Sequence, residues 1–147
     1  HPKGITAVFV TRFFQRTTVG VVNIPADLHY TKDHEWVHLN GFTARIGITD
    51  YAQDALGDVV FVNLPRIGTD VLVGESFGEV ESTKSVSEIY APLAGKVIAV
   101  NTALDETPQL MNSDPYGEGW LCEIEIGDVS TAELLLSDVQ YRALIGD

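Results

Sequence analysis

The stretch GEVESTKSVSEIYAPLAGKV, residues 78–97, decides the fold because it reads as two β-strands joined by a short polar turn. The runs FGEVES and VSEIYAP flank the turn S-T-K-S, which holds Lys84. The chain has only three other lysines, and the small neighbours Ser82, Thr83 and Ser85 leave the Lys84 amine sterically open to a modifying enzyme. Taken alone, the turn is more typical of a solvated lysine in an acidic hairpin than of a modified one, because exposed lysines in turns are common.

The rest of the chain is also rich in short strands. HEWVHL (34–39) is followed by Asn40-Gly41, a two-residue hairpin signal, and then by FTARIGI (42–48). DVVFVNL (58–64) reads as a β-branched strand, and GWLCEIEI (119–126) alternates apolar and acidic residues. Many short strands with glycine-rich turns predict an all-β sandwich or barrel with small helical additions.

Helix signals are few and short. Thr49 or Asp50 can cap a helix over YAQDAL, which Gly57 would stop. Near the end of the chain, Ser130–Glu133 and Ser137–Gln140 both fit the capping box. One or two short helices are therefore expected at the C-terminus.

Charge and cysteine content exclude several classes of function. The net charge of −12 disfavours binding to nucleic acids and anionic membranes, and favours protein partners with basic faces. Cys122 is the only cysteine, which excludes disulfide frameworks and cysteine metal clusters within one chain. It shares a face with Trp120 and Ile124, so we expect a core thiol rather than a nucleophile.

Residues 1–23 differ from the rest, because they contain Lys3, Arg12 and Arg16 and no acidic residue. We expect a leader, tag remnant or extension outside the domain, with an organellar presequence as the alternative. The domain is then residues 24–147. A bacterial cytoplasmic location is favoured, and the mitochondrial matrix follows if the leader is a presequence.

The segment His34-Glu35-Trp36-Val37-His38 matches the zinc protease pattern H-E-x-x-H. That pattern needs a helix, whereas this segment runs into a hairpin. On a strand the two histidines would lie about 13 Å apart, too far to share one metal. No metal site, nucleophile triad or nucleotide-binding loop is predicted, and we expect no independent catalytic activity.

The lysine hairpin resembles that of the biotinyl/lipoyl carriers, in which an A-P-x-x-G-x-V turn follows the modified lysine, here Ala91–Val97. Within that superfamily the chain resembles the glycine cleavage H-protein family from about Ile24 onward. The matching blocks are HYTKDHEWV (29–37), GITDYAQDALGDVVFVNLP (47–65), GEVESTKSVSEIYAP (78–92) and TPQLMNSDPYGEGWL (107–121). The resemblance implies a mainly β barrel-sandwich hybrid with short helices.

The resemblance also implies a function. Lys84 would be joined by an amide to lipoic acid, and the arm would carry an aminomethyl group from glycine decarboxylase (P protein) to the aminomethyltransferase (T protein). Dihydrolipoamide dehydrogenase (L protein) would reoxidise the arm, and lipoylating enzymes would attach it. The protein would be a non-catalytic carrier, and a monomer suits a shuttle that presents one face to several enzymes.

Two acids match family positions near the cleft that holds the loaded arm. Glu35 lies in the H-E-W block and Glu88 just after the modified lysine, and a carboxylate there could pair with a cationic methylamine. Both positions also suit ordinary surface residues. Asp33 stands where the family often has a small hydroxyl residue.

The main alternatives are a biotin carrier and a lipoyl domain of a 2-oxoacid dehydrogenase. Biotin carriers flank the lysine with methionines, whereas this chain has Thr83 and Ser85. Lipoyl domains of the acyltransferases usually place Asp before the lysine. A purely structural module, the third alternative, predicts no modification.

Overall fold

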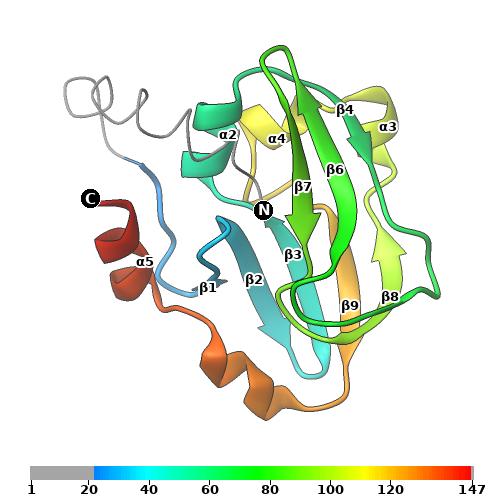
Figure 1. Ribbon diagram of the computed structural model, residues 1–147, viewed down its shortest axis with the longest axis vertical. Coiled ribbons are helices and arrows are strands. Elements are labelled where there is room, and N and C mark those ends of the chain that lie inside the picture. The colour runs from blue at the N-terminus through cyan, green and yellow to red at the C-terminus, as the bar shows by residue number, and fades with distance from the viewer. Residues whose placement is uncertain (1–21, 147) are drawn as a thin grey trace.

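The computed structural model describes residues 22–146, which form two antiparallel sheets around one hydrophobic core (Figure 1). In spatial order, the larger sheet contains β1 (His29–Tyr30), β2 (Glu35–Asn40), β3 (Thr43–Ile48), β9 (Cys122–Ile126), β8 (Gly95–Val100) and β5 (Asp70–Val71). The smaller sheet contains β4 (Val59–Asn63), β6 (Ser76–Ser82) and β7 (Val86–Tyr90). The predicted mainly β, two-sheet architecture is confirmed.

Short helices connect and flank the sheets. They are α2 (Asp50–Leu56), α3 (Ala103–Glu106), α4 (Leu110–Ser113), the 3₁₀ helix η1 (Val129–Leu134) and α5 (Asp138–Ile145). Thr49 caps α2 and Gly57 ends it, as predicted. The capping box at Ser137 is also confirmed. The one at Ser130 is wrong, because the Asp128 carboxylate caps η1 by accepting a hydrogen bond of 2.9 Å from the Ser130 N–H.

The β2–β3 hairpin is confirmed, but its turn is displaced by one residue. Asn40 pairs with Thr43, so the two-residue loop consists of Gly41 and Phe42 rather than Asn40 and Gly41. Gly41 has φ +63°, while Phe42 keeps a negative φ. A type II′ turn needs positive φ only at its first central residue, and that residue is preferentially glycine.

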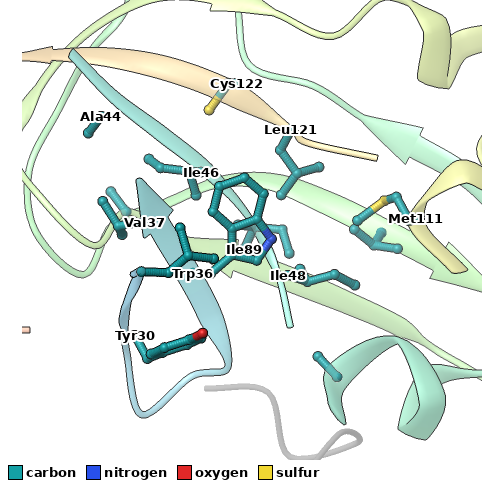
Figure 2. Packing of buried hydrophobic residues seen from close by; sticks show 14 of the residues in the cluster. Tyr30, Trp36, Val37, Ala44, Ile46, Ile48, Ile89, Met111, Leu121 and Cys122 are labelled. Carbon is teal, nitrogen blue, oxygen red and sulfur yellow. The ribbon is translucent and has the colours of Figure 1, made fainter. Parts of the chain in front are cut away.

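The core is organised around Trp36, which is 1% exposed and points its indole into the space between the sheets (Figure 2). Its Nε1–H donates a hydrogen bond of 2.9 Å to the Pro115 carbonyl. Gly47, opposite Trp36 on β3, leaves room for the ring, because a Cβ there would lie 2.6 Å from the indole. Ile46, Ile89 and other apolar side chains from both sheets complete this cluster. The core therefore ties the large sheet to the lysine hairpin.

Helix α5 closes the molecule by holding the start of the described chain. Tyr141 stacks on Tyr30 with ring centroids 4.8 Å apart, and its hydroxyl is 2.8 Å from both His34 Nδ1 and Thr49 Oγ1. Arg142 donates a hydrogen bond of 2.9 Å to the Ile24 carbonyl. Val22 is buried as well, so packing already begins there. The domain boundary at Ile24 stays a prediction, and residues 1–21 lie outside the described part of the chain.

Candidate functional site

Lys84 lies at the end of the β6–β7 hairpin, in a turn that hydrogen bonds make rigid. The Ser82 hydroxyl accepts hydrogen bonds of 3.1 Å from the backbone N–H groups of Lys84 and Ser85. It also donates to the Ser85 carbonyl over 3.2 Å, and the Ser82 N–H donates to the same carbonyl over 2.8 Å. The turn is thus fixed by its own small polar residues, while the Lys84 side chain is exposed.

The tip rests against the junction between α2 and β4, which lies beside the upper end of the hairpin in Figure 1. The Thr83 N–H donates a hydrogen bond of 3.0 Å to the Asp58 carbonyl. The Lys84 side chain runs past Gly57, where a Cβ atom would lie 3.2 Å from the lysine Cε. The base of the lysine side chain therefore has a defined position on the protein.

Glu35 is 2% exposed, so it is a core acid rather than a surface one. Its Oε1 accepts a hydrogen bond of 2.8 Å from the Thr31 hydroxyl, and its Oε2 accepts one of 2.9 Å from the Tyr90 N–H. Burial raises the pKa of Glu35 to about 8, against the lowering effect of those two hydrogen bonds. At neutral pH this position therefore favours a neutral carboxylic acid, which the sequence did not indicate.

Glu88 is exposed on the outer face of the smaller sheet, directly opposite Glu79 of β6. Its charge nevertheless reaches Tyr90, because burial and then the carboxylates of Glu88, Asp33 and Glu35 raise the pKa of the Tyr90 hydroxyl. Of these three acids, Glu35 contacts Tyr90 directly, through the Tyr90 N–H at the end of β7 away from the tip. Lys84 and Tyr90 are six positions apart, and strand β7 covers Val86–Tyr90, so they are separated by at most about 20 Å.

Two serine hydroxyls on β7 and the adjoining turn have no hydrogen-bond partner among the described residues. Ser85 Oγ and Ser87 Oγ are buried, and Ser87 is only 1% exposed. They alternate along the chain with the exposed Val86 and Glu88, so both face inward. The S-x-S spacing after the lysine is the one signal in the sequence that marks these two serines. They lie between Lys84 and Tyr90 in the sequence, and their hydroxyls point into the protein rather than onto its surface.

A cavity of about 430 Å³ adjoins Glu35 and Asp33 at the Tyr90 end of β7. Most of its wall is apolar and comes from Tyr30, Val73, Pro92, Leu93, Leu134 and Leu136. A second cavity of about 490 Å³ is lined by Trp36, Arg45 and Glu123 among others, and by no residue of the β6–β7 hairpin. Of these two cavities, the first adjoins the predicted site residue Glu35, and neither is lined by Lys84 or Glu88.

The remaining sequence candidates have structural roles. The H-E-x-x-H segment is strand from Glu35 onward, as predicted, and His34 precedes it with φ +70°. Within residues 22–146 no group of three or more His, Cys, Asp or Glu residues is placed to hold a metal ion. Cys122 is fully buried, and burial raises the pKa of its thiol to about 12, so it is a core thiol. No helix in the described chain is long and apolar enough to cross a membrane.

Two packed antiparallel sheets with an exposed lysine on a rigid hairpin tip define the class of biotinyl/lipoyl-type barrel-sandwich carriers. Comparison with known proteins narrows the class. Residues 28–147 match the family model for the glycine cleavage H-protein. The chain belongs to the glycine cleavage H-protein family.

Individual proteins of this family are similar to the chain along most of their length. The glycine cleavage system H protein of Mycobacterium bovis (strain BCG / Pasteur 1173P2) is 66% identical over 130 residues, which cover 84% of this chain and 97% of that protein. The H protein of Mycobacteroides abscessus is 56% identical over 128 residues, which cover 86% of this chain and 98% of that protein. A crystal structure of a glycine cleavage system H protein from Mycobacterium marinum superposes with a TM-score of 0.75 at 44% identity, covering 84% of this chain and all of that one.

Proposed function

We propose that this chain is the lipoyl-bearing shuttle of the glycine cleavage system, with lipoate joined by an amide to Nζ of Lys84. It would carry the aminomethyl group from glycine decarboxylase to the aminomethyltransferase, and dihydrolipoamide dehydrogenase would reoxidise it. Lipoylating enzymes would be further partners. The observation that carries the proposal is the position of Lys84, which is exposed on a rigid hairpin tip in a chain of this family.

The residues around Lys84 fit an amide-linked arm. The missing side chain at Gly57 leaves room beside the lysine, and the small residues Ser82, Thr83 and Ser85 leave its amine open. Lipoate supplies a dithiol/disulfide pair, and the protein supplies presentation and partner contacts. A non-catalytic role follows from this division of chemistry.

Glu35, Glu88 and Tyr90 provide a place for the far end of the arm. Glu88 and Asp33 contribute negative charge near Tyr90, and a cationic amine would be attracted there. Glu35 is neutral near pH 7 but would ionise more readily beside a cation, because an opposite charge favours the charged form of a carboxyl. The adjoining apolar cavity would keep water away from this end.

We propose a monomer, because a shuttle must present one face to several enzymes. The relatives named above are mycobacterial, which favours the bacterial cytoplasm over a mitochondrial matrix as the proposed location.

The test of the function is reconstitution with the three purified partner enzymes. Lys84→Arg should abolish glycine cleavage without unfolding the protein, while Lys96→Arg, an exposed lysine on β8, should leave the rate unchanged. Glycine cleavage supported by Lys84→Arg would overturn the proposal. A second measurement addresses Glu35: the Glu35→Ala protein should still be lipoylated but should release ammonia from the loaded state faster. An unchanged release rate would remove Glu35 from the site.

A further inference from the structure

We infer that the α2–β4 junction, residues 57 and 58, is a seat that holds the Lys84 side chain and sets the direction in which the arm leaves the hairpin, and that Asn112 fixes this seat. The role of this seat in presenting a lipoyl arm rests on the proposed function. Its structural content can be tested on the unmodified protein.

The first observation is the contact between Gly57 and Lys84. A Cβ on Gly57 would lie 3.2 Å from Cε, 3.5 Å from Cδ and 3.6 Å from Nζ of the lysine, so any larger residue would press on the outer half of that side chain. The backbone at Gly57 has φ +83° and ψ −160°, a combination that residues with a side chain rarely adopt. Glycine is therefore required here both by the turn after α2 and by the lysine that packs on it.

The second observation is a backbone hydrogen bond that joins the seat to the hairpin tip. The Thr83 N–H donates a hydrogen bond of 3.0 Å to the Asp58 carbonyl. Thr83 directly precedes Lys84, and Asp58 directly follows Gly57. The Gly57 N–H donates to the Gln53 carbonyl over 3.0 Å, which fixes the junction to the end of α2. Two separate segments thus meet at the base of the lysine.

The third observation is the side chain of Asn112, which reaches this junction from α4. Its Nδ2 donates to the Gly57 carbonyl over 2.9 Å and to Gln53 Oε1 over 3.0 Å. Its Oδ1 accepts a hydrogen bond of 2.9 Å from the Val59 N–H. One amide therefore spans the residues before, within and after the seat. Asn112 belongs to the block at residues 107–121 that resembles the family, and these hydrogen bonds give it a structural role there.

The direction of the arm follows from these contacts. Lys84 lies on the α2 side of the hairpin, whereas Glu79, Val86 and Glu88 are exposed on the outer face of the small sheet. An arm that starts against Gly57 leaves the hairpin on the α2 side rather than across that outer face. A lysine released from the seat would sample both sides of the hairpin.

The experiment compares a chemical and an enzymatic reaction at the same amine. The unmodified protein is treated with limiting acetic anhydride, and the acetylation of Lys84 is measured by mass spectrometry relative to Lys32 and Lys96 in the same molecules. Separately, a purified lipoate–protein ligase with lipoate and ATP modifies the same proteins, and kcat and KM are determined. The variants are Gly57→Asn and Asn112→Ala, with Gly41→Asn as the matched control, because Gly41 also has a positive φ but has open space around it.

Both seat variants should raise acetylation of Lys84 about two-fold or more relative to the other lysines, because the side chain is no longer held against the protein. They should also lower kcat/KM for the ligase, since an enzyme gains rate from a substrate group held in position. Gly41→Asn should change neither. A general loss of structure would instead raise the acetylation of all three lysines together, and that result would overturn the inference. So would unchanged acetylation and ligation in the seat variants.

The test of the seat and the test of the lipoyl assignment can fail independently. If the wild-type lysine accepts no lipoate but the acetylation pattern appears as expected, the seat exists and the lipoyl assignment fails. If Gly57→Asn does not fold, Asn112→Ala decides alone, because it keeps glycine at position 57 and removes only the side chain that fixes the junction.

Discussion

The backbone N–H of Tyr90 donates a hydrogen bond of 2.9 Å to Oε2 of Glu35, joining residues 55 positions apart in the sequence. Tyr90 is the last residue of β7, an edge strand whose outer N–H groups lack a neighbouring strand. Glu35 begins β2 of the other sheet. This one bond therefore closes part of the open edge of the lysine hairpin and connects it to the large sheet.

The first prediction concerns the pH dependence of stability. The pKa of Glu35 is raised from 4.5 to about 8 by burial, so between these values the folded protein keeps a proton that the unfolded chain releases. The contribution of this proton to the free energy of unfolding is complete below pH 4.5 and is lost as the pH rises through 8. Between the two pKa values the loss is up to about 1.4 kcal/mol per pH unit. Urea unfolding of the wild type and Glu35→Gln should show the wild type losing stability relative to the variant from pH 5 to 8. Parallel pH profiles for the two proteins would show that Glu35 does not titrate in this way.

The second prediction concerns Gly95, the glycine of the A-P-x-x-G-x-V turn. Gly95 pairs with Ile126, and a Cβ there would lie 2.3 Å from the Glu125 carbonyl oxygen, a backbone atom that cannot move aside. Gly95→Ala should lower the free energy of unfolding by roughly 1–3 kcal/mol. Gly127→Ala is the matched control, because nothing lies within 4 Å of its Cβ position. Equal effects of the two substitutions in urea titrations would contradict this explanation.

The third prediction separates two serines near the lysine. Ser87→Ala removes a buried hydroxyl without a partner, so stability should be unchanged or should rise by up to about 1 kcal/mol. Ser82→Ala removes the hydroxyl that accepts two backbone N–H groups of the tip, and should cost about 0.5–2 kcal/mol. Thermal and urea unfolding measure both. A larger loss for Ser87→Ala than for Ser82→Ala would mean that Ser87 already has a structural partner.

Much of the fold could be predicted because its signals are local. The tip lysine with its small neighbours, the Thr49 cap followed by Gly57, and the capping box at Ser137 each lie within a few residues of sequence. The displaced turn at Gly41 shows the limit of such signals. The Asn-Gly pair indicated the hairpin, but the pairing of Asn40 with Thr43 selected the turn type.

The site was less predictable, because its parts come from distant segments. Glu35 was a candidate contact for the arm, but nothing near it in the sequence showed that it is buried and hydrogen-bonded to residues 31 and 90. Helix α4 has only four residues and no apolar period, so nothing in the sequence showed that Asn112 reaches Gly57. Sequence patterns specified which lysine is presented, and tertiary packing specified what holds it.

The most direct test of the account is the mass of the protein after expression with an active lipoylation pathway, followed by peptide mapping. We predict one lipoyl group, located on Lys84, and no lipoyl group on the Lys84→Arg protein prepared in the same way. A protein that stays unmodified under these conditions, or that carries biotin or bears its lipoyl group on another lysine, would contradict the account.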